Sequence, residues 1–381
     1  MGWGETMSDT GRLCRQKRIY DEAGTEALFL RAMGENVSRH YARCPEYREI
    51  LDRAGFRPED LLTPGDLVRL PFLTTLYLKR HTLLSVPERK LLIKADSSGT
   101  GGTRSHVGLD LKSLLLGLRM VIRVGKARRL WSLRPCNYVI FGYRPGKNVT
   151  AGASKTAYGF TFFAPALRRT YALEQTGDGG WDLSWDRILR ELERCASSPF
   201  PLRTMGFPAY TYFLLRELRG RGVRYVMPKG SMVALGGGWQ QFYAERVEKE
   251  EFYALVKEVL DIDESHVVEF FGAVEHPVLY ADCPCHRFHV PVFSRVLIRS
   301  PEDFSPAPDG QPGLVDLLTP MMQSAPLSSV MTDDLGVLHR EPCPCGAGSP
   351  WLEILGRVGV SDIVTCAAGA EELLNGSGEA T

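Results

Sequence analysis

Hydrophobic residues in the first part of the chain recur at helical spacing and then give way to prolines. Between about residues 21 and 54 they fall three and four positions apart, which predicts two leading helices. Pro58, Pro64 and Pro71 follow in a stretch that we expect to be rich in loops. The short apolar run at residues 91–95 predicts a strand.

Farther along, the pattern alternates between strand-like and helix-like segments. Helical spacing covers residues 109–125, 182–195, 210–218 and 246–260, and β-rich apolar runs cover residues 138–143, 225–227 and 233–235. Residues 301–312, rich in proline, aspartate and glycine, predict an exposed hairpin or loop. Such alternation predicts an α/β fold with open sheets flanked by helices.

Composition argues against nucleic-acid binding and membrane insertion. The 381 residues carry 46 lysines and arginines against 45 aspartates and glutamates, so the basic excess typical of nucleic-acid binding is missing. The apolar runs are too short to span a membrane, and the first residues lack the apolar core of a signal peptide. We therefore expect a cytoplasmic protein with no nucleic-acid partner and no membrane insertion.

A loop rich in glycine and hydroxyl side chains follows the strand predicted at residues 91–95. Its glycines would let backbone N–H groups approach phosphate oxygens, and its hydroxyls add donors. The spacing matches neither a Walker A loop nor the dinucleotide-binding fingerprint, and an ordinary surface loop has the same composition. The candidate phosphate-binding residues are Ser97, Ser98, Gly99, Thr100, Gly101 and Gly102.

Four later segments follow this loop in a fixed order. They are Leu-Gly-Gly-Gly-Trp, Phe-Phe-Gly-Ala-Val-Glu-His, Met-Thr-Asp-Asp-Leu-Gly and a final Gly-Arg. With the loop, they resemble the motifs of the ANL superfamily of adenylate-forming enzymes. The resemblance implies the ANL fold, with a large domain at residues 1–355 and a short hinge and tail at 356–381. The residues that carry it are Gly236, Gly237, Gly238, Trp239, Gly272, Glu275, Asp334 and Arg357.

The resemblance implies ATP and Mg²⁺ as cofactors and a role for each segment. The loop would hold phosphate, the glycine-rich turn would pack on adenine, and Arg357 would open the hinge. Glu275 would ligate Mg²⁺, a hard ion that prefers carboxylate oxygen, and Asp334 would accept hydrogen bonds from the ribose hydroxyls. The chain departs from the family pattern at Gly101 and Val274, where threonine is usual.

Within the superfamily, the chain resembles LuxE-type acyl-protein synthetases most closely and phenylacetate-CoA ligase-like proteins next. Only 24 residues follow Arg357, in place of the separate lid domain that bears an activating lysine in acyl-CoA synthetases. LuxE-type proteins carry the acyl group on their own cysteine near the C-terminus, and Cys366 stands where that nucleophile is expected. The alternative role for Cys366 is a small core residue.

Two close cysteine pairs, Cys283 with Cys285 and Cys343 with Cys345, indicate a metal site. Two such cysteine pairs can supply the four ligands of a tetrahedral structural zinc site, in which His286 or His289 could replace one thiol. Free thiols or a single disulfide are the alternatives.

The sequence therefore predicts ATP-dependent activation of a carboxylic acid, with a fatty acid as the leading substrate. The acyl group would pass to a thiol, either Cys366 with an acyl-reductase as the next partner or a separate acceptor. A second hypothesis is adenylation of an aromatic or other biosynthetic acid, with coenzyme A or a carrier protein as acceptor. A third is a binding protein that kept the fold without catalysis.

Overall fold

The computed structural model describes residues 7–96, 105–143, 152–175, 181–183, 185–239 and 245–357. The chain divides into two compact units. The first combines both ends of the chain, Met1–Val124 and Gly272–Thr381, and the second is the middle, Gly125–Phe271.

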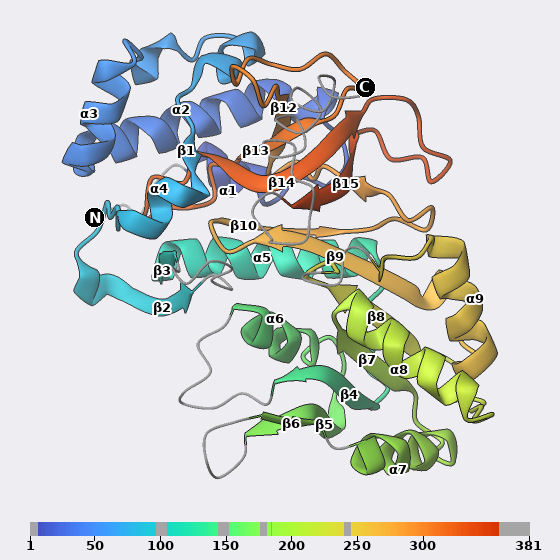
Figure 1. Cartoon of the computed structure of the whole chain (residues 1–381). Helices are drawn as coiled ribbons and strands as arrows, with labels where there is room; N and C mark the ends of the chain where they lie inside the picture. The colour runs from blue at the N-terminus through green and yellow to red at the C-terminus, as the bar shows by residue number, and fades with distance from the viewer. Residues whose placement is uncertain are drawn as a thin grey trace, which may run out of the picture. The chain divides into compact units, whose positions relative to one another are not determined.

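The first unit opens with helices α1 (Asp9–Leu13), α2 (Glu26–Arg43) and α3 (Pro45–Arg53). The last two confirm the pair of leading helices, and Pro45 starts α3 at a position where its missing N–H costs nothing. The buried face of α2, including Phe29 and Met33, packs with Leu327 and Val330 from the far end of the sequence. Figure 1 shows these helices in blue beside the orange strands of the same unit. The short helix α4 (Thr75–Arg80) follows.

A six-stranded sheet forms the body of the first unit. Its main path runs β11 (Phe288–His289), β15 (Trp351–Arg357), β14 (Ser329–His339), β13 (Gly313–Leu318) and β12 (Arg295–Arg299), all antiparallel. Strand β1 (Leu73–Thr74) adds to β14 in parallel. The unit also holds the hairpin β2 (Leu91–Asp96) with β3 (His106–Asp110), and strand β10 (His276–Ala281). Helix α5 (Leu111–Ala127) follows β3 directly.

The second unit contributes six neighbouring strands to its sheet. Their order is β9 (Val267–Ala273), β8 (Met232–Gly236), β7 (Leu202–Gly206), β4 (Cys136–Tyr143), β5 (Ala166–Gln175) and β6 (Trp181–Leu183). All pairs are parallel except β5 with β6. The parallel pairs require crossover connections, which explains the alternation of strand and helix seen in the sequence.

Helices cover both faces of this second sheet. Val139 of β4 packs in the same core cluster as α7 (Trp185–Ala196), α8 (Pro208–Gly220) and α9 (Lys249–Leu260). Its neighbour Tyr138 points the other way, with its ring 6.1 Å from that of Phe160 in α6 (Gly152–Phe160). The predicted α/β fold, with sheets flanked by helices, is confirmed.

Four details of the predicted elements were wrong, of which one is that the helix predicted from residue 246 begins at Lys249. Residues 225–227 form no strand, because the N–H groups of Tyr225 and Met227 donate to the carbonyls of Val259 and Leu260 at the end of α9. The helix predicted from residue 182 begins at Trp185, since 181–183 pair with β5 as β6. The helix predicted from residue 109 begins at Leu111, because residues 106–110 form β3.

No helix among the described residues is long and apolar enough to cross a membrane.

Candidate active site

The candidate phosphate loop, residues 97–104, lies outside the described residues, and so does Cys366. The strands on either side of the loop are described. Strands β2 and β3 pair antiparallel up to Asp96 opposite His106, so the loop joins the two strands of a hairpin. The roles predicted for Ser97, Ser98, Gly99, Thr100, Gly101 and Gly102 remain predictions.

The glycine-rich turn lies in the second unit, directly after β8. Gly237 and Gly238 have φ angles of 84° and 66°, a left-handed backbone that explains two glycines in succession. Trp239 is buried, with its ring centroid 5.8 Å from that of Tyr212, so it anchors the turn to the core of that unit. Its contact with adenine remains a prediction.

Glu275 lies in the first unit, at the tight turn between β9 and β10. Its side chain is 3% exposed, which is rare for a glutamate and differs from the surface position typical of a single acid. The preceding Val274 packs against the apolar core of the same unit. A carboxylate held at a turn is a fitting ligand for a hard divalent cation.

The β14–β15 hairpin supplies the other charged groups. Asp334 and Arg357 lie opposite each other in the register of the two strands, with Arg357 Nε 3.9 Å from Asp334 Oδ1. Arg357 Nη2 also lies 4.0 Å from Asp333 Oδ2. These are ion-pair distances, longer than hydrogen bonds, and Arg357 Nε is buried without a hydrogen-bond partner among the residues that the structure describes. A guanidinium held in this way has donors left for a ligand.

Burial raises the pKa of Asp334 above its usual value, and the nearby negative charges of Asp333 and Glu275 raise it further. Arg357 and the hydroxyl of Thr332 act in the opposite direction. The predicted site residues Glu275, Asp334 and Arg357 are therefore close enough in the first unit for their charges to interact.

Asp333 contacts two further residues, which the sequence did not indicate as part of this cluster. Thr75 donates a short hydrogen bond to Asp333 from the start of α4, and Lys79 on the same helix lies 3.6 Å from Asp333 Oδ2. Nothing in the sequence near Thr75 and Lys79 connects them to Asp333, 258 positions away from Thr75. Strand β1, which pairs with β14 at Thr74 and Met331, creates the contact.

The predicted metal site also comes together in the first unit. Cys283, His289, Cys343 and Cys345 place one ligand atom each within 4.8 Å of all the others. The eight cysteines in the described part of the chain, including Cys285, are all free thiols. Cys285 is not part of this four-residue set, so the geometry differs from the predicted set of four cysteines.

Cys285 nevertheless lies beside the cluster. Burial raises the pKa of its thiol, and interactions with the thiols of Cys343 and Cys283 add to that shift. His286 is directed elsewhere, with Nδ1 at 2.7 Å from Asp282 Oδ2.

The model of the acyl-protein synthetase family LuxE matches residues 18–375. The chain belongs to this family. It is 24% identical to the long-chain-fatty-acid–luciferin-component ligase of Aliivibrio fischeri, over 86% of this chain and 82% of that protein. It is 25% identical to the phenylacetate-coenzyme A ligase of Thermus thermophilus, over 83% of this chain and 67% of that protein.

Solved structures show the same fold. A 2-hydroxyisobutyryl-CoA ligase in the postadenylation state superposes with a TM-score of 0.66 at 14% identity, covering 90% of this chain and 69% of that one. The same enzyme in an open conformation covers 92% and 78%, with a TM-score of 0.65. The predicted family, the adenylate-forming fold and the assignment as a ligase are thereby confirmed for this LuxE family member.

Proposed function

We propose that this LuxE-type chain uses ATP and Mg²⁺ to convert a fatty acid into an acyl-AMP, and then transfers the acyl group to a thiol. The observation that carries the proposal is the charged cluster in the first unit. Glu275, Asp334 and Arg357 are the residues assigned to metal, ribose and hinge, and their side-chain charges interact. The similarity to fatty-acid ligases supports the choice of acid.

The reaction has two steps. An oxygen of the substrate carboxylate attacks the α-phosphorus of ATP, the bond to the β-phosphate oxygen breaks, and pyrophosphate leaves. A thiolate then attacks the acyl carbon, the acyl–phosphate bond breaks, and AMP leaves with the electron pair. The protein forms no bond in the first step, so it acts there by positioning and by charge.

The residues of the cluster have separate tasks in this proposal. Glu275 would hold Mg²⁺, which would neutralise charge on the phosphates. Asp334 accepts hydrogen bonds from the ribose hydroxyls, which positions the nucleotide. Arg357 partly offsets the negative charge of Asp333 and Asp334, which opposes the rise in the pKa of Asp334 and so favours its ionised form.

Cys366 is the proposed first acceptor, which makes the enzyme itself the carrier before an acyl-reductase partner. Its support is the family membership and its position near the C-terminus. We further propose a cytoplasmic location, where ATP and reduced thiols are both available, and a structural zinc ion at the cysteine pairs.

Acid-dependent ATP–pyrophosphate exchange tests the first step. We expect exchange with long-chain fatty acids in the native chain and a loss of at least about 100-fold in kcat for Glu275→Gln, because removing a metal-borne charge stabilisation has effects of that order. Glu269→Gln, at a partly exposed glutamate of β9, is the matched control. Folded protein that exchanges with no acid would support a binding protein instead.

Aromatic acids with coenzyme A as acceptor are the second candidate, favoured by the similarity to phenylacetate-coenzyme A ligases. The same exchange assay separates the two, because only the preferred class of acid sustains pyrophosphate exchange at low concentration.

Covalent labelling tests the acceptor. Incubation with ATP and a radiolabelled acid should attach label to the native chain, and hydroxylamine should release it as expected for a thioester. Cys366→Ser should keep pyrophosphate exchange and lose that label, whereas Cys195→Ser, a buried thiol of the second unit, should keep both. A hydroxylamine-sensitive label on Cys366→Ser would rule out Cys366 as the carrier.

A further inference from the structure

The cluster of Cys283, His289, Cys343 and Cys345 points to a more specific assignment. We propose that these four side chains are the ligands of one structural zinc ion and that Cys285 is not a ligand. This inference refines the zinc ion of the proposed function, and it holds or fails independently of adenylation. Three observations carry it.

The two cysteine pairs have the same local geometry. Each lies in a Cys-Pro-Cys-X turn that is closed by the N–H of the fourth residue donating to the carbonyl of the first. These hydrogen bonds are 2.8 Å long for His286 to Cys283 and 2.9 Å for Gly346 to Cys343. The fourth residue is left-handed in both turns, with φ angles of 52° and 79°. Such a conformation is unfavourable for histidine, so the surrounding structure must hold the first turn in place.

The distances between ligand atoms suit tetrahedral zinc. A Zn–S bond of about 2.3 Å and a tetrahedral angle separate two sulfur ligands by roughly 3.8 Å. The Sγ atoms of Cys283 and Cys343 are 3.8 Å apart, far beyond a disulfide bond. Cys345 Sγ lies 3.2 Å from His289 Nε2, within the same small volume.

His289 is oriented as a zinc ligand would be. Its Nδ1 lies 3.0 Å from the carbonyl oxygen of Ser349, which can only accept, so Nδ1 carries the proton. The lone pair is then on Nε2, which faces Cys345. The side chain is 1% exposed, and its strand β11 pairs with β15 at Trp351. His286 also has its Nδ1 on an acceptor, Asp282, but its ring nitrogens are not among the ligand atoms that lie within 4.8 Å of one another.

Three thiolates and one imidazole fill a tetrahedral site, so no position remains for Cys285. Its thiol would lie next to the site and outside the coordination shell.

The zinc ion would link two loops. Each loop adjoins strands that have a proposed ATP-site residue at their opposite end. Cys283 follows β10, the strand that begins directly after Glu275. Cys343 and Cys345 lie in the connection between β14 and β15, the strands of Asp334 and Arg357. A metal ion bound by residues of both loops would hold these strands of the first unit together, at the ends away from Glu275 and Asp334.

Metal analysis of the purified full chain tests the assignment. Mass spectrometry of bound metals should find close to one zinc per chain in the native protein and in Cys285→Ser. The matched variant Cys283→Ser, in the same turn, and His289→Ala should retain less than about a tenth of it. Native protein that holds no zinc after incubation with Zn²⁺ and a reductant would overturn the proposal. So would loss of zinc from Cys285→Ser with retention in His289→Ala.

A measurement on the native chain covers the case in which a ligand variant does not fold. Replacement of the zinc by Co²⁺ should give the absorption of a tetrahedral site with three thiolates and one imidazole. Cys285→Ser should leave the spectrum unchanged. A four-thiolate spectrum that weakens in Cys285→Ser would overturn the ligand set. Pyrophosphate exchange is not the readout in either experiment, so these results do not depend on the proposed function.

Discussion

At the scale of single residues, several charged side chains lie so close together that the pKa of one depends on the charges of the others. Asp334 is largely shielded from solvent beside two other acids, and the pairing of β14 with β15 puts Arg357 opposite it. A carboxyl in such a position binds its proton more tightly than one in water. Nucleotide binding should therefore respond to pH in a way that the neighbours of Asp334 control.

Asp334 should make the KM for ATP depend on pH. Its ionised form is required for the ribose hydroxyls, so KM should rise as pH falls through its raised pKa. Asp333→Asn removes a nearby negative charge and should move this rise to lower pH, whereas Arg357→Gln should move it to higher pH. Hydrogen bonds to a charged group are worth about 1.5–3 kcal/mol, so Asp334→Asn should raise KM by roughly 10- to 100-fold.

Exchange kinetics at a series of pH values would measure these shifts. Identical pH profiles in the native chain, Asp333→Asn and Arg357→Gln would contradict the role given to Asp334.

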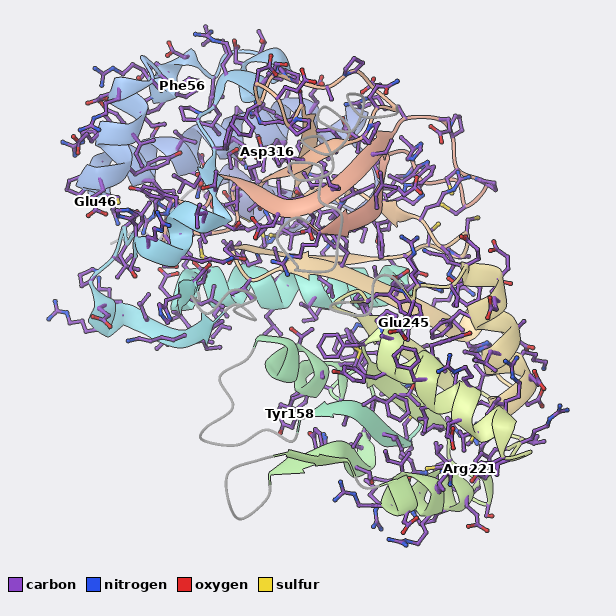
Figure 2. The ribbon with its side chains drawn as sticks, in the orientation of Figure 1. Glu46, Phe56, Tyr158, Arg221, Glu245 and Asp316 are labelled. Atoms are coloured by element: carbon purple, nitrogen blue, oxygen red, sulfur yellow. The ribbon has the colours of Figure 1, made fainter. Side chains whose placement is uncertain are left out.

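At the scale of elements, strands distant in sequence are joined by buried polar contacts as well as by their backbones. Arg299 on β12 and Asp316 on β13 form a buried ion pair, with Nε 2.7 Å from Oδ2. Asp316 lies in the interior of the first unit (Figure 2), where Ser329 of β14 also donates to it at 2.8 Å. Arg299 Nη2 donates to the carbonyl of Val68, which connects the sheet to the N-terminal segment.

Loss of this ion pair should cost more stability than loss of a surface pair. Asp316→Ala leaves the Arg299 guanidinium buried without its partner, and such changes cost about 3–5 kcal/mol. The control, Glu49→Ala, breaks an exposed pair with Arg53 and should cost at most about 1 kcal/mol. Urea unfolding of the three proteins measures the difference, and equal free energies of unfolding for both variants would contradict it.

At the scale of the whole molecule, the chain folds back on itself so that its two ends build one unit. His40 of α2 is fully buried at this junction. Its Nε2 lies 3.1 Å from the carbonyl of Met322 and its Nδ1 2.7 Å from Ser85 Oγ. Burial lowers the pKa of His40 to about 4, and the charges of Arg39 and Arg43 act in the same direction, against Asp110 and the bond to Met322.

This histidine should make the folded state sensitive to acid. In the unfolded chain it takes up a proton near pH 6.5, whereas the folded chain resists protonation down to about pH 4. Its contribution is therefore complete above pH 6.5 and is lost as pH falls toward 4, by about 3 kcal/mol in all. The variant His40→Leu should be less stable at pH 7.5 but should lose less stability between pH 7 and 4.5. Urea unfolding at several pH values tests this, and an equal loss in both proteins would contradict it.

The sequence by itself determined the fold class and the family. Spacing of apolar residues predicts α2, α3, α8 and β4 because burial of one face dictates that spacing. The motifs around Glu275 and Asp334 are contiguous, since each serves one turn or strand, and so they can be recognised without a structure. The prediction of a strand at 225–227 was wrong, because an apolar run does not show which backbone groups its N–H and C=O groups will bond to.

Only the tertiary structure decided which distant residues share a site. Lys79 and Thr75 reach Asp333 because β1 pairs with β14, a contact between segments more than 250 residues apart. His289 rather than Cys285 completes the cluster with Cys283, Cys343 and Cys345, because β11 pairs with β15. Such pairings depend on strand register across the whole first unit, and no local pattern in the sequence encodes them.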